Sequence, residues 1–236
     1  MIEIIPAIMP DSQEDLIEKA TRVRGHVPLA QIDIMDGVFV KSKSWPYTTG
    51  GVKRDKYFLA LTNQDEGLPF WDDLDYEIDL MITEPEKHID EWLPLGASRL
   101  IFHIESIKDA DLFWGHDIWK EGARDIGGEK VVEIGLAINP DTPIDMILPY
   151  VPLIDFVQCM GIAKIGYQGQ EFDERVLEQV NQLRVKFPNL PISVDGGVSP
   201  ETVPLLCSAG ANRVVSGSAI FGSNDIKVAI KSLKNS

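Results

Sequence analysis

Short apolar runs and longer amphipathic segments alternate along the chain. The apolar runs have the length of strands, and we expect strands at 2–8, 29–35, 76–82, 99–104, 131–138, 153–160, 192–195 and 213–216. Segments with apolar residues three or four positions apart predict helices at 13–24, 86–93, 173–186, 201–209 and 225–233, with another that begins near Pro143. The order of elements is therefore strand, then helix, repeated.

Eight strand–helix units in 236 residues are typical of a (β/α)8 TIM barrel, an α/β fold. A doubly wound open sheet is the alternative, but no glycine-rich turn follows the first strand, and this favours the barrel. Because no linker interrupts the pattern, we expect one domain over residues 1–236.

The segment at about 38–75, between the second and third predicted strands, is long for such a barrel. It is rich in aromatic residues, namely Trp45, Tyr47, Tyr57, Phe58, Phe70 and Trp71. We expect a packed surface insertion, and the alternatives are a lid over a ligand and a contact between subunits.

Composition limits the function. A net charge of −15 argues against binding to nucleic acid or to an anionic membrane surface. Cys159 and Cys207 lie far apart, so no disulfide framework is expected. No apolar stretch is long enough to span a membrane, and the first residues lack the basic region of a signal peptide. The expected location is the cytoplasm.

Polar residues stand at the ends of several predicted strands, where TIM barrels place their active sites. Residues 31–37 read QIDIMDG, and alternation along the strand puts Gln31 and Asp33 on one side. Asp79 and Asp195 occupy similar positions on other strands, although Asp79 alone is equally typical of a cap or turn. Carboxylates that lie close together must share protons, meet cations or bind a metal.

Glycine-rich turns follow the last two predicted strands. They read DGG at 195–197 and SGSAIF at 216–221, and a third stretch, GYQGQ, lies at 166–170. Glycines allow close approach of the backbone to a ligand, and these turns are the common phosphate site of TIM barrels. The alternative is that the glycines only turn strands into helices, but two adjacent glycine-rich turns favour a phosphate site.

Several motifs together resemble the ribulose-phosphate 3-epimerase family of ribulose-phosphate-binding barrels. They are IIPAIM, IDIMDGVFV, LMITEP, FHIES, IGLAINPDTP, GYQGQEF, SVDGGVSPETV and AGANRVVSGSAIF. The resemblance implies an isomerase that interconverts the D-ribulose and D-xylulose forms of a ketopentose 5-phosphate through an enediolate. It also implies a phosphorylated ketose as partner and assembly into a homo-oligomer.

The resemblance assigns roles to individual residues. Asp33 and Asp195 would be the catalytic pair, one removing the C3 proton and the other returning it on the opposite face. Substrate contacts would come from the shielding methionines and the phosphate loops: Met35, Met81, Met160, Gly169, Gly196, Gly197, Gly217 and Ser218. His103, within FHIES, is a secondary candidate for substrate binding, although a single histidine lining a barrel is more often part of the scaffold.

The chain departs from the family pattern at the metal site. Gln31 and Asp79 stand where the family has its two metal-ligating histidines, while Ala7 and Gln168 replace a serine and a glycine. One interpretation is an all-oxygen site made by Gln31, Asp33, Asp79 and Asp195, which would favour Mg²⁺ or Mn²⁺ over Zn²⁺. The others are a metal-free barrel with another isomerase or lyase reaction, and a barrel that only binds a phosphosugar. We favour the first interpretation.

Overall fold

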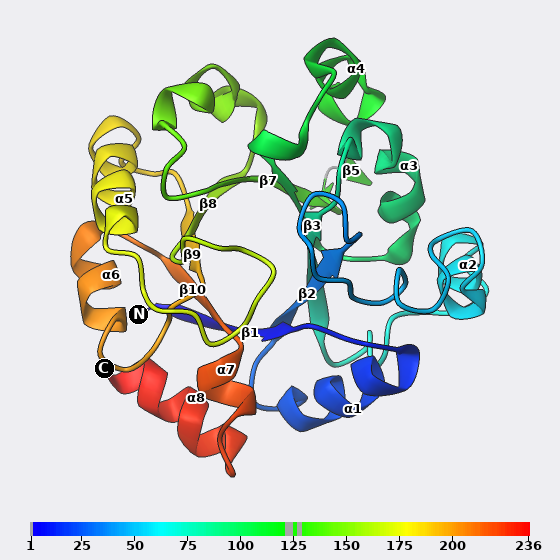
Figure 1. Cartoon of the computed structure of the whole chain (residues 1–236), viewed down its shortest axis with the longest axis horizontal. Helices are drawn as coiled ribbons and strands as arrows, with labels where there is room; N and C mark the ends of the chain where they lie inside the picture. The colour runs from blue at the N-terminus through cyan, green and yellow to red at the C-terminus, as the bar shows by residue number, and fades with distance from the viewer. Residues whose placement is uncertain (1, 121–124, 127–128) are drawn as a thin grey trace.

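The protein is described by a computed structural model that covers residues 2–120, 125–126 and 129–236. Within these ranges, eight parallel strands close into a barrel in the order β1-β10-β9-β8-β7-β4-β3-β2 (Figure 1). The strands are β1 (Glu3–Ile8), β2 (Leu29–Met35), β3 (Asp75–Met81), β4 (Arg99–His103), β7 (Glu133–Ile138), β8 (Phe156–Met160), β9 (Ile192–Asp195) and β10 (Arg213–Ser216). The predicted (β/α)8 TIM barrel is confirmed.

Helices surround the barrel on its outside (Figure 1). They are α1 (Gln13–Val23), α2 (Lys56–Thr62), α3 (Ile89–Trp92), α4 (Ala110–Gly115), α5 (Arg175–Lys186), α6 (Val203–Ala209), α7 (Ser218–Phe221) and α8 (Ile226–Asn235). Short 3₁₀ helices lie at Pro85–Lys87, Leu93–Leu95, Ile104–Ser106, Asp117–Trp119, Ile144–Met146 and Leu148–Leu153, and β5 (Asp125–Ile126) pairs with β6 (Glu129–Lys130). None of the helices in the described ranges has the length and hydropathy of a membrane span.

Side chains of each barrel strand alternate between two environments. On β2, Ile32 and Ile34 belong to the large apolar core between the barrel and its helices. Gln31 and Asp33 alternate with them in sequence and therefore face the barrel interior. This alternation places polar groups inside the barrel without exposing the apolar face of the strand.

One predicted helix has a different form. The segment after Pro143 makes 3₁₀ helices at Ile144–Met146 and Leu148–Leu153 rather than an α-helix. Pro149 and Pro152 lack the backbone N–H that an α-helical hydrogen bond needs, so a regular helix cannot form there. The following strand, β8, consequently begins at Phe156 rather than at Leu153.

Other boundaries also differ from the sequence pattern. The strand expected from Val131 begins at Glu133, and Val131 itself is half exposed. The helix expected at 86–93 is divided into a 3₁₀ turn, α3 and a second 3₁₀ turn. Pro94 stands inside this stretch and interrupts the backbone hydrogen bonding of a longer helix.

The long segment at 38–75 packs into the apolar shell of the barrel. Trp45 and Phe58 are each only 1% exposed, and their rings lie 5.9 Å apart between centroids. Phe58 also makes an edge-on contact with Trp92 of α3, at 4.9 Å. Burial of such a side chain stabilises the fold by roughly 2–3 kcal/mol. Trp45 and Phe58 thus anchor the segment to the barrel, whereas Trp71 is largely exposed.

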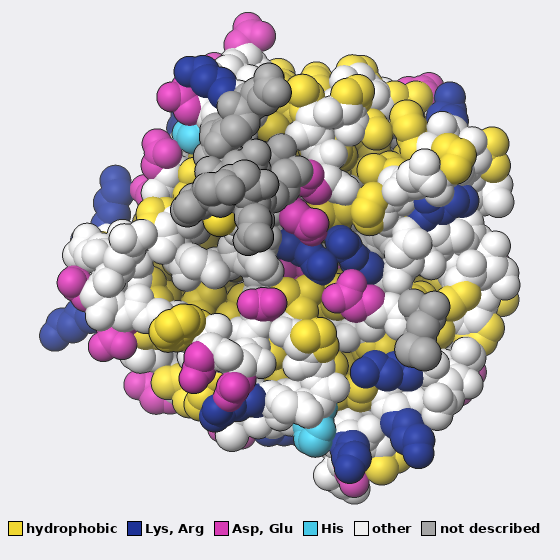
Figure 2. Space-filling model, turned by 180° about the vertical axis from the view of Figure 1, so that it is seen from behind, with side chains coloured by type: hydrophobic (Ala, Val, Ile, Leu, Met, Phe, Trp, Pro, Cys, Tyr) yellow, Lys and Arg dark blue, Asp and Glu magenta, His cyan; other side chains and the backbone are white. Residues whose placement is uncertain are grey.

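The N-terminal end of the barrel holds a cluster of ion pairs, which we call the arginine cluster. Arg99 binds Glu77 and Glu133 at 3.1 and 2.9 Å, and Arg213 binds Glu3 at 3.2 Å. Figure 2, which views the molecule from the side opposite to Figure 1, shows basic and acidic side chains gathered near the middle of this face. The carboxylates at this end are therefore matched by guanidinium groups from the same chain.

Candidate active site

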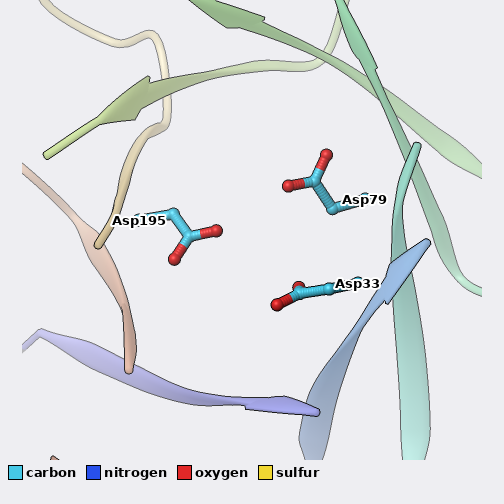
Figure 3. Close-up of side chains that lie close together, drawn as sticks. All are labelled: Asp33, Asp79 and Asp195. Atoms are coloured by element: carbon cyan, nitrogen blue, oxygen red, sulfur yellow. The ribbon is translucent and has the colours of Figure 1, made fainter. Parts of the chain in front are cut away.

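Three aspartates meet at the C-terminal end of the barrel, and we call them the aspartate cluster. The register of β2 and β3 pairs Asp33 with Asp79, while Asp195 ends β9. One carboxylate oxygen from each residue lies within 4.8 Å of the others. In Figure 3, Asp33 and Asp79 point inward from neighbouring strands, and Asp195 approaches from across the barrel. The structure thus brings together the three carboxylates predicted from the strand ends.

Gln31 lies directly among these carboxylates. Its Nε2 donates to Asp33 Oδ1 at 2.8 Å and to Asp195 Oδ2 at 2.9 Å. The side chain is fully buried, and its Oε1 has no hydrogen-bond partner among the described residues. The amide therefore bridges the predicted catalytic pair and leaves one buried carbonyl oxygen available.

Asp79 is held differently from the other two aspartates. His103 Nε2 lies 3.0 Å from its Oδ1, and Gln158 Nε2 lies 3.3 Å from its Oδ2. Asp79 is fully buried and does not line the pocket, whereas Asp33 and Asp195 do. Asp33 Oδ2 and Asp195 Oδ1 accept no hydrogen bond from the described part of the chain, and because both residues line the pocket, these are the oxygens available to a ligand.

The environment favours retention of a proton by this group of carboxylates. Burial raises the pKa of Asp33 well above its usual range, and the charges of Asp195 and Asp79 raise it further, against the hydrogen bond from Gln31. Burial, followed by the charge of Asp79, raises the pKa of Asp195 to about 7. Since neighbouring buried carboxylates cannot all ionise cheaply, one protonated and one ionised aspartate can coexist near neutral pH.

His103 lies behind Asp79 rather than in the pocket. It is fully buried, and its ring contacts Phe39 at 5.5 Å between centroids. Burial alone would lower the pKa of His103, but the charge of Asp79 and the hydrogen bond between them raise it overall. The geometry gives His103 a contact with an aspartate and none with the pocket space.

A pocket opens over the free oxygens of Asp33 and Asp195. Most of the predicted substrate-contacting residues line it, and they are Met81, Met160, Gly169, Gly196, Gly197, Gly217 and Ser218. Met35 lies just outside, packed with Met81 and Val40. The pocket therefore joins the carboxylate pair to the glycine-rich turns.

Glycine is required at the turn after β9. Gly196 and Gly197 have φ angles of 94° and 66°, in the left-handed region. A Cβ atom on Gly197 would lie 2.8 Å from the Cα of Phe172, too close for any side chain. This edge of the pocket thus presents bare backbone.

The pocket lining contains no Lys or Arg within the described residues. Gln168 reaches across the opening, with Nε2 3.5 Å from the carbonyl oxygen of Ala7. Its amide also lies against Gly217, where an added Cβ would come within 2.6 Å of Nε2. An anionic group bound here would rely on backbone N–H groups and neutral side chains.

The donor set suits a divalent cation. The aspartate cluster offers three carboxylate oxygens that lie within 4.8 Å of one another, while Gln31 turns its Nε2 toward them and would add Oε1 as a ligand only after its amide rotates. Hard cations take such oxygen ligands. The residues present therefore fit a divalent metal site.

Gln158 was not identified from the sequence as a site residue. It lies on β8 within FVQCM, in an otherwise apolar strand, two residues before Met160. That spacing puts both side chains on the same face of the strand. A single polar residue within an apolar strand was therefore the sequence signal that could have identified Gln158 as a site residue.

Known proteins resemble this chain over nearly its whole length. The model of the family described as "Ribulose-phosphate 3 epimerase family" matches residues 3–221. The cytoplasmic isoform of ribulose-phosphate 3-epimerase from Oryza sativa subsp. japonica is 30% identical over 239 residues, which cover 99% of this chain and 93% of that protein. Ribulose-phosphate 3-epimerase from Bacillus subtilis is 30% identical over 242 residues, 100% of both chains.

Solved structures support the fold. The crystal structure of KGPDC from Streptococcus mutans has a TM-score of 0.65 at 15% identity, covering 100% of this chain and 96% of that one. At this sequence identity, the structural similarity supports only the assignment of the barrel fold. The family match and the two curated relatives carry the assignment, and together they show that the chain belongs to the ribulose-phosphate 3-epimerase family.

Proposed function

We propose that this protein interconverts D-ribulose 5-phosphate and D-xylulose 5-phosphate. The observation that carries the proposal is the pair Asp33 and Asp195, each with one free carboxylate oxygen at the floor of a pocket edged by glycine-rich turns. Membership of the epimerase family supports the same reaction. Another isomerase or lyase reaction and a purely binding role are less favoured, because both members of the carboxylate pair are retained.

The two aspartates would act as acid and base on opposite faces of the substrate. An ionised carboxylate removes the proton from C3, an enediolate forms, and the protonated partner returns a proton to the other face. Asp33 and Asp195 come from β2 and β9, on different sides of the barrel, which suits a substrate held between them. Their raised pKa values suit a pair in which one member is protonated.

Methionines would shield the reacting carbon. Met81 and Met160 line the pocket beside the carboxylates and are almost fully buried. Their thioethers donate no hydrogen bonds, so they exclude water without offering a competing proton. The phosphate would lie against Gly169, Gly196, Gly197, Gly217 and Ser218, with Gln168 as a neutral donor nearby.

The metal would be Mg²⁺ or Mn²⁺ rather than Zn²⁺, held by Asp33, Asp79 and Asp195, with Gln31 Oε1 as a fourth ligand after rotation of its amide. When bound, such an ion supplies positive charge that stabilises the oxygens of the enediolate. The side chains of this chain provide only oxygen ligands at these positions. We further propose that the protein is cytoplasmic, like its rice relative, and that it forms a homo-oligomer.

Incubation of ribulose 5-phosphate with the protein in D2O, followed by NMR, tests the proposal. Separate samples would contain Mg²⁺, Mn²⁺, Zn²⁺ or EDTA. We expect deuterium at C3 and appearance of xylulose 5-phosphate, fastest with Mg²⁺ or Mn²⁺. Absence of C3 exchange under every metal would exclude the epimerase, and allulose 6-phosphate in the same assay tests a longer ketose phosphate.

A further inference from the structure

Gln158 makes a second amide contact with the aspartate cluster. Its side chain is fully buried on β8, and Nε2 lies 3.3 Å from Asp79 Oδ2 and 3.5 Å from Asp195 Oδ2. Both distances are long for single hydrogen bonds, but the amide nitrogen carries two hydrogens and can direct one at each carboxylate. The proposed reaction assigns no role to Gln158.

An apolar side chain would fill this position more easily. Gln158 Oε1 is buried and has no hydrogen-bond partner among the described residues. Burial of a polar atom without a partner is unfavourable, so packing alone does not account for the amide. The favourable contacts of this side chain are those that its nitrogen makes with the carboxylates.

Gln31 and Gln158 each join a different pair of residues in the aspartate cluster. Gln31 joins Asp33 to Asp195, and Gln158 joins Asp195 to Asp79. Both amides contact the same oxygen of Asp195, Oδ2. Asp195 Oδ1 is thereby left to face the pocket, and rotation of the carboxylate would break two contacts at once.

We propose that Gln158 is a positioning residue, whose amide fixes Asp79 and Asp195 so that Asp195 presents Oδ1 to the substrate. This inference rests on the proposed function, because it assigns Asp195 a proton-transfer role. Gln158 itself does not line the pocket and is not expected to touch the substrate.

Gln158→Met tests the inference, since it keeps the approximate size and removes the donor. Misplacement of a catalytic group by about 1 Å can reduce the rate about 100-fold. We expect kcat for epimerisation to fall about 10–100-fold with KM nearly unchanged, and Mn²⁺ affinity to fall about 10-fold. Gln158→Leu, which also lacks the N–H, should change kcat in the same direction if Gln158→Met does not fold.

Gln179→Met is the matched control. Gln179 is also a buried glutamine, but its Nε2 donates to the backbone oxygens of Asn139 and Thr142, away from the aspartates. It should lower the melting temperature and leave kcat and Mn²⁺ affinity at the wild-type values. If Gln158→Met behaves like this control, Gln158 is only structural and the inference is overturned.

Crystal structures separate this inference from the proposed function. In Gln158→Met we expect the carboxylate of Asp195 to rotate or shift by about 1 Å. An unchanged Asp195 would overturn the positioning role even if the wild-type protein is an active epimerase. A shifted Asp195 in a protein whose wild type shows no C3 exchange would support positioning and refute the epimerase.

Discussion

The two ends of the barrel interior both gather carboxylates, but only one end neutralises them with arginine. The arginine cluster at the N-terminal end sets Arg99 and Arg213 against three glutamates. The aspartate cluster at the C-terminal end is contacted by two neutral amides and by His103. The difference indicates that the first cluster is complete within the chain, while the second retains charge for a ligand.

The largest effect should come from removal of either member of the catalytic pair. Asp33→Asn or Asp195→Asn keeps the shape of the side chain and removes the acid–base group. We expect epimerisation to fall by about 10³-fold or more, since general acid–base groups contribute about 10²–10⁴-fold. Conversion of ribulose 5-phosphate to xylulose 5-phosphate, measured by NMR, checks this, and conversion at the wild-type rate in either variant would show that its aspartate is not part of the catalytic pair.

A substitution in the arginine cluster should lower the free energy of unfolding rather than the catalytic rate. Arg99→Met leaves Glu77 buried without its closest cation. Loss of one partner of a buried pair destabilises by about 3 kcal/mol, and we expect urea denaturation to show a loss of this size. The kcat value should stay within about twofold of wild type. A large loss of kcat in Arg99→Met with unchanged stability would contradict the view that the N-terminal end of the barrel serves stability and the C-terminal end serves catalysis.

Asp79 should have an intermediate effect. Both of its oxygens are engaged by His103 and Gln158, so it does not face the substrate. We expect Asp79→Asn to lower Mn²⁺ affinity and kcat by about 10–100-fold. Titration with Mn²⁺ followed by electron paramagnetic resonance measures the affinity. An unchanged Mn²⁺ affinity in Asp79→Asn would show that Asp79 is not a metal ligand.

The smallest effect is a pH dependence of stability in metal-free protein. The pKa of Asp195 rises from 3.8 in its ordinary state to about 7 in the fold, so the folded state binds a proton more tightly than the unfolded state. The contribution of Asp195 to stability is therefore highest below about pH 4 and declines as pH rises to about 7.

Asp195→Asn removes this decline. We expect its melting temperature in EDTA, relative to wild type, to rise by a few degrees between about pH 5 and pH 8. Asp33→Asn should behave in the same direction, because burial also raises the pKa of Asp33. A pH-independent difference would mean that Asp195 is already ionised in the fold at low pH.

Much of the barrel follows directly from the sequence pattern. Strand runs such as 29–35 and 213–216 keep their predicted boundaries, and the apolar residues within each run are buried. Asp33 and Asp195 were recognisable because a carboxylate at the end of such a strand has no place in an apolar core. The 3₁₀ helices at 144–153 were missed because the apolar spacing outweighed Pro149 and Pro152 in the prediction.

Contacts between side chains from strands that are not neighbours could not be predicted from the sequence. Gln158 and Asp79 lie 79 positions apart, and their contact depends on the register of strands that are not neighbours. The ion pairs of the arginine cluster were missed for another reason: Arg99, Glu133, Glu3 and Arg213 stand at strand starts, which look like solvent-exposed flanks, although the register pairs Arg99 with Glu133 and Glu3 with Arg213. Whether buried polar residues from different strands pair is decided by closure of the barrel.

The isotopic composition of the first product formed in D2O tests the two-aspartate account most directly. Ribulose 5-phosphate is mixed with enzyme and a divalent metal, and the reaction is stopped at low conversion. If different carboxylates remove and return the proton, nearly all xylulose 5-phosphate should carry deuterium at C3 while remaining ribulose 5-phosphate carries little. Product that retains protium at C3 would show that one group moves the proton, and would contradict the assignment of Asp33 and Asp195 as separate acid and base.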